Sequence, residues 1–219
     1  MRKELLDSGT DVNSWSSLGK GDHTPLMYAV YMGHVEVARV LVEAGADVNT
    51  AHAPDHTVLY HALESFQLSA ELVQLLVDAG VDVNHKSLFW TVEFASRTLA
   101  GGSEVQEVMR ILIDAGADVR ARDESGTPVI VHAVRYRNNQ LVETLLRSGA
   151  DIDATEQSSG RTALGLAAAI EAPETVKLLI EWGADLEASD KSGDTPLMIA
   201  RGKGSEEIAK LLIDAGATR

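Results

Sequence analysis

The stretch Leu41-Val42-Glu43-Ala44-Gly45-Ala46-Asp47-Val48-Asn49 recurs in recognisable copies from near the first residue to the last. In each copy an apolar helical segment runs into a glycine, and these glycines follow one another every 33 to 36 residues: Gly9, Gly45, Gly80, Gly116, Gly149, Gly183 and Gly216. Because glycine adopts the left-handed conformation without a Cβ clash, each copy predicts the end of a helix. A fixed period of this size indicates an array of stacked repeats.

A second recurring pattern predicts where helices begin. Thr24-Pro25-Leu26-Met27-Tyr28-Ala29 precedes Gly45 by 21 residues. Threonine can accept hydrogen bonds from the first amides of a helix, and proline fits the first helical turn. Related starts follow Thr57, Thr162 and Thr195, whereas Thr127-Pro128 lies one residue further from its alanine. Each repeat is therefore expected to hold two helices.

Threonine-proline-leucine near an alanine, followed by a second helix that ends in Ala-Gly-Ala-Asp, resembles the ankyrin repeat, and the resemblance covers nearly the whole chain. It implies an all-α solenoid of stacked helix pairs with hairpin-like finger loops. We expect a single array over residues 1–219, made of a half-repeat or cap at 1–14, repeats at 15–50, 51–85, 86–121, 122–155 and 156–189, and a C-terminal repeat or cap at 190–219.

The repeat at 86–121 departs most from the pattern. It has no Thr-Pro, and its entry reads Lys86-Ser87-Leu88-Phe89-Trp90-Thr91. If Ala95 is the alanine of the repeat, Trp90 takes the place of the capping threonine. Finger loops normally carry small polar residues, so this apolar triplet is either folded into the core or exposed as a binding site. The sequence leaves both possibilities open.

Composition restricts the class of protein. The chain has 219 residues, of which 45% are hydrophobic, and it has no apolar run of the length that a membrane helix needs. With 33 acidic and 19 basic residues the net charge is −14, which disfavours nucleic acid as a partner. The absence of cysteine excludes disulfides and thiolate metal sites. The N-terminus shows no signal-peptide core, and we expect a soluble, cytoplasmic protein.

The resemblance implies that partners contact the finger tips and the inner face of the first helices, near the end of each. Aromatic and arginine side chains dominate binding energy at protein interfaces. We therefore predict partner contacts at Trp15, Tyr31, Met32, Leu88, Phe89, Trp90, Arg97, Arg122, Arg135 and Tyr136.

Arginines gather in the repeats between residues 86 and 189 of this otherwise acidic chain: Arg97, Arg120, Arg122, Arg135, Arg137 and Arg161. Arginine in such positions suits the recognition of carboxylates. The alternative is a solvated face on which the arginines balance Asp118, Asp123 and Glu124. If Arg135 is a binding residue, Arg135→Glu should leave the melting temperature nearly unchanged.

Histidines raise the question of a metal site. His52 and His56 lie in one finger with Asp55 between them, but no third strong ligand is near them in the sequence. Metal sites need converging ligands that are oriented by further hydrogen bonds. We expect no metal and no cofactor.

No phosphate-binding loop, nucleophile elbow or zinc-protease motif is present in the sequence. The acids that could serve in catalysis, such as Asp47, Asp82, Asp118 and Asp151, recur at the repeat period, which indicates a structural role because an active site is needed once. We expect a non-catalytic scaffold that binds a partner protein. The alternatives are an inhibitor or immunity protein that covers a basic toxin or enzyme site, and a metal-dependent or enzymatic protein. We expect a monomer, unless the N-terminal half-repeat docks on another chain.

Overall fold

The computed structural model of the protein describes residues 11–15, 23–53, 55–65, 68–84, 86–97 and 103–218, with the side chains of residues 95–97 outside the description. The chain forms two compact units, one of residues 1–94 and 100–117 (unit 1) and one of residues 95–99 and 118–219 (unit 2). Within the described residues the regular elements are all helices, and two isolated β-bridges close finger loops, Ala51 with Thr57 and Arg122 with Pro128. The all-α solenoid fold expected from the sequence is confirmed.

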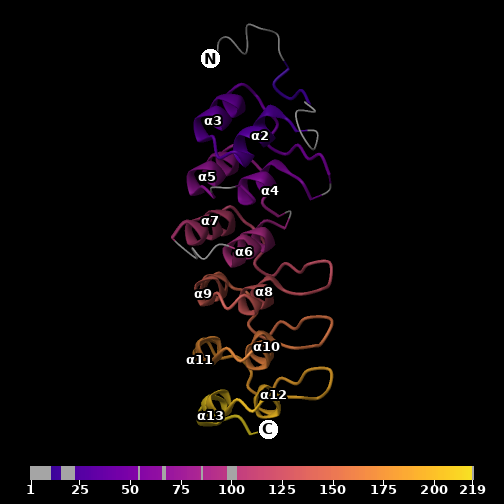
Figure 1. Ribbon diagram of the computed structural model, residues 1–219, viewed down its shortest axis with the longest axis vertical. Helices are drawn as coiled ribbons and strands as arrows, with labels where there is room; N and C mark the ends of the chain where they lie inside the picture. The colour runs from indigo at the N-terminus through magenta and orange to yellow at the C-terminus, as the bar shows by residue number, and fades with distance from the viewer. Residues whose placement is uncertain are drawn as a thin grey trace. The chain divides into compact units, whose positions relative to one another are not determined.

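Unit 1 contains helices in two layers (Figure 1). Its first-layer helices are α2 (Pro25–Tyr31), α4 (Val58–Leu63) and α6 (Ser87–Arg97), whose last three residues are assigned to unit 2. The second-layer helices are α3 (Val35–Glu43), α5 (Ala70–Asp78) and α7 (Ser103–Asp114). Helix α2 packs against α3 and α4, and α5 packs against α3, α4 and α7. The core of this unit therefore lies between the layers and between successive pairs.

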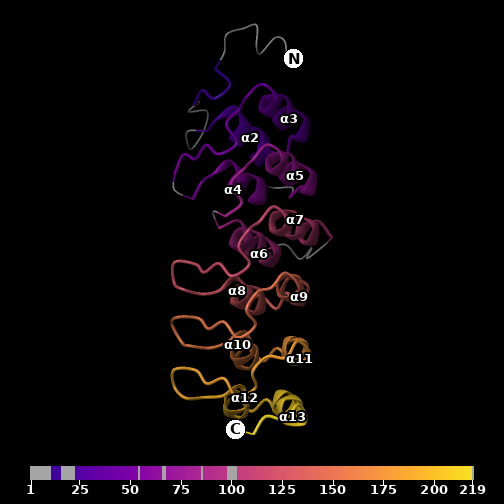
Figure 2. The ribbon, with the colours of Figure 1, turned by 180° about the vertical axis from the view of Figure 1, so that it is seen from behind.

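Unit 2 repeats the arrangement with more regular spacing. Its first layer is α8 (Val129–Arg135), α10 (Ala163–Ala169) and α12 (Pro196–Lys203), and its second layer is α9 (Asn139–Arg147), α11 (Pro173–Glu181) and α13 (Glu206–Asp214). Helix α10 contacts α8, α11 and α12, so each pair buries its apolar face against the next pair. The loops before α8, α10 and α12 all project to the same side of this unit, as both views show (Figures 1 and 2).

The helix starts and ends follow the local chemistry that the sequence predicts. The side-chain oxygens of Thr24, Thr57, Thr162 and Thr195 each accept a hydrogen bond from the backbone N–H three residues on. The glycines after the second helices have left-handed φ angles, for example 91° at Gly45 and 89° at Gly149. Thr127 does not cap α8, because that helix begins one residue later, after Pro128.

Helix α6 corrects the predicted start of the irregular repeat. It begins at Ser87, so Trp90 lies inside the helix and does not occupy a capping position. Among the α6 residues whose side chains are described, the buried ones are Ser87, Leu88, Thr91 and Val92, which have the same spacing as the buried Val58, Leu59, Ala62 and Leu63 in α4. Thr91 therefore takes the place of the repeat's alanine, and the earlier alignment on Ala95 is wrong. The expected glycine-containing turn at 100–103 and the expected cap at 1–14 fall mostly outside the described residues, and the repeat boundaries remain predictions.

The recurring acids are structural. The carboxylates of Asp47, Asp82, Asp118, Asp151 and Asp185 each accept a hydrogen bond from the backbone N–H two residues on, which holds the turn after the glycine. Within each unit the side chain two positions after the turn aspartate also joins neighbouring repeats. The Oδ1 atom of Asn49 accepts from the N–H of Asp82, and the Oδ1 atom of Asp153 accepts from that of Asp185. No helix in the described part of the chain is long and apolar enough to cross a membrane.

The glycine turn gives a first prediction. Gly149→Val should lower the free energy of unfolding by about 1–2 kcal/mol, because valine is strained at a left-handed φ. Steric overlap does not contribute, since no heavy atom lies within 4 Å of a Cβ built at this position. Gly202→Ala is the control: that site is equally open but helical, so alanine should be neutral or stabilising. Urea denaturation of the two variants measures the difference, and equal losses would contradict the assignment.

Candidate functional site

The ends of the first-layer helices in unit 2 form a row of exposed and half-buried residues, which we call the helix-end row. It consists of Arg135, Tyr136 and Arg137 after α8, Ala169, Ile170 and Glu171 after α10, and Arg201, Gly202 and Lys203 at the end of α12. The three helices pack side by side, so these ends are neighbours. Tyr136 is 42% exposed, and Arg201 and Lys203 form no ion pair with any described residue. The row therefore combines an aromatic side chain with cations in an acidic protein.

Two residues of the row have an unusual backbone. Arg137 and Glu171 have φ angles of 55° and 54°, at the position where α12 ends in glycine, Gly204. A left-handed residue other than glycine costs about 1 kcal/mol or more. The side chain of Arg137 explains why a residue other than glycine stands at this strained position. It donates a hydrogen bond to the carbonyl of Ile170 and so joins α8 to α10.

The arginines of unit 2 mostly bind their own chain. Arg120 donates to the carbonyl of Gly149 at 3.2 Å, and Arg122 donates to that of Thr155 at 2.7 Å. Arg135 pairs with Glu156 at 3.0 Å and Arg161 with Asp190 at 3.1 Å. The bonds of Arg120, Arg135 and Arg161 link one repeat to the next. Their bonds go to other groups than Asp118, Asp123 and Glu124, and the alternative of a solvated face on which the arginines balance those acids stays a prediction.

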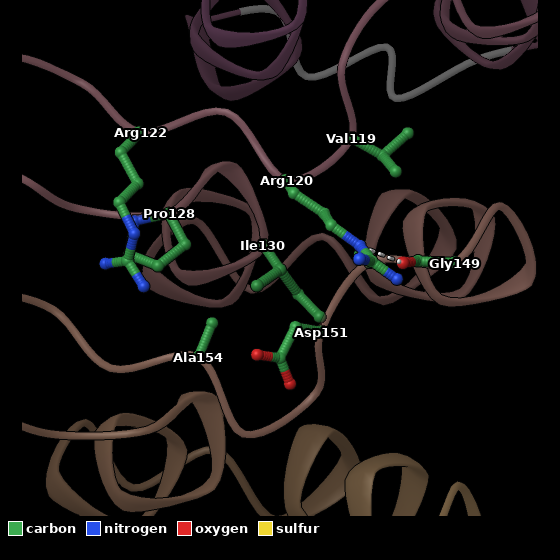
Figure 3. Close-up of a pocket in the computed structure, with 9 residues that line it drawn as sticks. Val119, Arg120, Arg122, Pro128, Ile130, Gly149, Asp151 and Ala154 are labelled. Carbon is green, nitrogen blue, oxygen red and sulfur yellow. Dashed lines mark hydrogen bonds between the residues drawn. The ribbon is translucent and has the colours of Figure 1, made fainter.

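A cavity of about 410 Å³ lies beside two of these arginines, between the connecting segments that precede and follow the α8–α9 pair (Figure 3). Its apolar part is formed by Pro128, Ile130 and Ala154. Arg120, Arg122 and Asp151 supply the polar part, and Figure 3 shows Arg120 bound to Gly149 across it. Both arginines beside the cavity donate hydrogen bonds to backbone carbonyls, Arg120 to that of Gly149 and Arg122 to that of Thr155, and these bonds hold their side chains in place.

The apolar triplet of the irregular repeat is packed to different degrees. Leu88 is 3% exposed and belongs to the core of unit 1, so the prediction that it contacts a partner is wrong for this residue. Phe89 and Trp90 are half-buried, and the Trp90 ring meets Tyr60 edge-on with 4.9 Å between centroids. The first turn of helix α6, not a finger loop, carries this triplet, which explains why it packs.

The other predicted contact residues have mixed surroundings. Trp15 is 48% exposed and Met32 is 39% exposed, whereas Tyr31 is half-buried with its ring edge-on to His61. The side chain of Arg97 lies outside the described part of the chain. The predicted residues before Arg97 lie in unit 1, and those from Arg97 onward lie in unit 2.

The structure gathers four histidines in unit 1 that the sequence separates. One ring nitrogen each of His23, His52 and His61 lies within 4.8 Å of the others, and the rings of His52 and His61 are stacked at 5.4 Å. His56 contacts His52, with 2.8 Å between His56 Nδ1 and His52 Nε2. The argument against a metal site, that no third strong ligand lies near His52 and His56 in the sequence, does not hold in space, because His23 and His61 lie beside His52. The sequence held one signal: His23 and His56 both stand directly before a capping threonine, so stacking of the two repeats brings them close.

His61 is the buried member of this cluster. It is 5% exposed, and its Nε2 atom has no hydrogen-bond partner among the described residues. Burial lowers the pKa of His61 to about 4, and the neighbouring His23, His52 and His56 contribute to the shift. The imidazole is therefore neutral at pH 7.

The family follows from a comparison with known proteins. The family model of ankyrin repeats (3 copies) matches residues 1–87 and 130–218, which is most of the chain. The chain is an ankyrin repeat protein. As a class, ankyrin repeats are protein-binding modules without catalysis.

Individual ankyrin proteins are similar over nearly the same span. The putative ankyrin repeat protein YahD of Escherichia coli is 30% identical over 197 residues, which cover 87% of this chain and 95% of YahD. The B-cell lymphoma 3 protein homolog of Mus musculus is 31% identical over 85% of this chain, which spans only 42% of that protein's length. The crystal structure of the Bcl-3 ankyrin repeat domain superposes with a TM-score of 0.78 at 27% identity, covering 91% of this chain and 89% of that domain. The human ASB11 ankyrin repeat domain gives 0.75 at 25% identity, covering 99% and 92%.

Asp123 provides a prediction on acid stability. Burial raises the pKa of this carboxyl, but hydrogen bonds from Ser125, Thr127 and His132 outweigh burial and lower the pKa to about 2. Since the folded pKa is below the unfolded value of 3.8, the carboxylate stabilises the ankyrin array above about pH 4, and this stabilisation is lost as the pH falls towards 2.

Asp123→Asn should therefore lower stability by about 1–2 kcal/mol at neutral pH, a value reduced for the partial exposure of the side chain. The difference from wild type should shrink as the pH is lowered from about 7 to about 3. Urea midpoints measured across this range check the slope. A difference that stays constant with pH would contradict the assignment.

Arg135 provides a prediction that corrects the expectation from sequence. Its partner Glu156 is only 8% exposed, so Arg135→Glu leaves a nearly buried carboxylate facing a second one. We expect a loss of about 1–2 kcal/mol, not an unchanged melting temperature. Lys177→Glu is the control, because its partner Glu174 is 71% exposed and the loss should stay below about 0.5 kcal/mol. The charge-swapped pair Arg135→Glu with Glu156→Arg should recover part of the stability.

Proposed function

We propose that the protein is a non-catalytic scaffold that binds an acidic segment of a partner protein on the helix-end row of unit 2. The observation that carries the proposal is Tyr136, an aromatic side chain left 42% exposed between two arginines. Tyrosine and arginine are the residues most often found at the energetic centres of interfaces. The row includes Arg135 and Tyr136, which lie near the end of a first helix, where the resemblance implies partner contacts.

Charge supports an acidic partner. The cations of the row stand in a chain of net charge −14, and the one acid among its nine residues is Glu171. Arg135 and Arg137 are held by Glu156 and by the Ile170 carbonyl, so their positions are fixed before a partner arrives. Arg201 and Lys203 are exposed and form no ion pair with described residues, which leaves their charges for a partner. A preorganised surface reduces the ordering cost of binding, and complementary charge speeds association.

The absence of catalysis in this protein is also a proposal. It is supported by the hydrogen bonds of the repeated aspartates, which use these acids to hold turns. The inhibitor hypothesis, in which an acidic surface covers a basic site, requires another face of the molecule, because the helix-end row is basic.

The test begins with a partner recovered by pull-down with the full chain, and continues with affinities of purified variants. Tyr136→Ala should weaken binding about 10-fold or more, since truncating a central aromatic anchor commonly costs above 1 kcal/mol. The double variant Arg201→Glu with Lys203→Glu should also weaken binding and should reduce its salt dependence. Neither change removes an intramolecular ion pair among the described residues, and the melting temperature of each variant, compared with wild type, shows whether it is folded.

Ile213→Ala is the control, because Ile213 is 48% exposed but belongs to the second layer of helices. Its affinity should match wild type. If Tyr136→Ala and the double variant also bind like wild type, the interface lies elsewhere. A recovered partner that is basic, and is unaffected by either change, would favour the inhibitor hypothesis.

A further inference from the structure

We propose that His23, His52 and His61 form a binding site for a divalent transition-metal ion, with His56 as a positioning residue. The site lies within unit 1, where the residue that ends the first finger meets the second finger and helix α4. It is independent of the helix-end row, which belongs to unit 2.

The geometry is close to that of a three-histidine site. The three candidate ligand nitrogens lie within 4.8 Å of one another. A tetrahedral ion with bonds of about 2.0–2.1 Å needs ligand nitrogens about 3.4 Å apart. Each ring therefore has to move inward by about an ångström, which small rotations of side chains on two finger segments can supply. Ring centroids 5.0 Å apart for His23 with both His52 and His61 show that the three side chains already converge.

His56 supplies the orienting contact that such sites use. Histidines that bind metals almost always donate their second ring N–H to another group, which fixes the tautomer and the ring orientation. Here His52 Nε2 lies 2.8 Å from His56 Nδ1. When His52 Nε2 donates to His56, the lone pair of His52 is placed on Nδ1 and is available to an ion. The His56 ring is itself stacked on Tyr60 at 4.9 Å, which holds it in place.

His61 supplies an independent observation. A buried polar nitrogen without a hydrogen-bond partner is destabilising, and native proteins contain few of them. His61 is 5% exposed and its Nε2 atom has no partner among the described residues. Coordination of an ion would satisfy the nitrogen that the protein itself leaves unsatisfied.

The donor set selects the class of ion. Three imidazole nitrogens suit Zn²⁺, Cu²⁺ or Ni²⁺, whereas Ca²⁺ and Mg²⁺ require oxygen ligands. The acidic field of the chain attracts a cation and offsets the charge placed among neutral ligands. Because the ligands come from the first finger, the second finger and α4, a bound ion would cross-link two consecutive repeats.

The experiment uses Zn²⁺ as the probe and full-length protein that carries no affinity tag and has been stripped of metal with a chelator. Isothermal titration calorimetry and metal analysis after gel filtration should give one Zn²⁺ per chain with micromolar or tighter affinity. The melting temperature should rise with added Zn²⁺. His23→Gln, His52→Gln and His61→Gln should each weaken binding at least 10-fold, and His56→Gln should weaken it less.

His34→Gln is the matched control, because His34 is exposed at the start of α3 and outside the cluster. It should bind Zn²⁺ like wild type. Circular dichroism checks that each variant is folded, and if His61→Gln unfolds, the finger variants His23→Gln and His52→Gln decide the result. No stoichiometric binding by wild type, or equal binding by wild type and the cluster variants, would overturn the proposal and leave the histidines as packed side chains only.

Discussion

The left-handed turn at the glycine that ends each second helix is the constraint on which the rest of the structure depends. At Gly45, Gly80, Gly149 and Gly183 the chain reverses within one residue and enters a turn closed by the following aspartate. That turn fixes where the next finger begins. Since a single helix pair cannot bury its apolar face alone, the position of the next pair decides whether a core forms.

The same turn places the side chains that bind one repeat to the next. Two residues after the aspartate stand Asn49, Arg120, Asp153 and Glu187, and each bonds to the backbone of the following repeat within its unit. Asparagine and aspartate do this by accepting an N–H, whereas Arg120 donates to a carbonyl. The geometry therefore tolerates different chemistry, provided that the side chain reaches the neighbouring turn. Stability is then distributed along the array and arises mainly from neighbouring repeats.

Local rules explain which parts of this structure could be predicted from the sequence. Capping by Thr24, the left-handed glycines and the aspartate turns depend on residues within four positions of one another, so their spacing revealed them. The start of α6 at Ser87 depended on burial against other helices, and the apolar Trp90 was misplaced for that reason. The partners of Arg122 and Arg135 lie 33 and 21 residues away, at distances that no local pattern encodes. The cluster at His61 needed the stacking of two repeats before its members could be seen as neighbours.

Recurrence separates the structural residues from the candidates for function. A side chain that the fold requires appears in nearly every repeat, as the capping threonines, the glycines and the turn aspartates do. The end of α8 carries the exposed Tyr136, whereas the ends of α10 and α12 carry no aromatic residue, and His61 is the one buried histidine among the described residues. Neither is needed by the packing rule that builds the array. Arg137 and Glu171 have a left-handed backbone, which is strained for residues other than glycine. The corresponding position after α12 is a glycine, Gly204, which adopts this conformation without strain. Departures of this kind are expected where a protein uses a regular scaffold for a specific contact, which is why the two proposed sites lie where the repeats differ from one another.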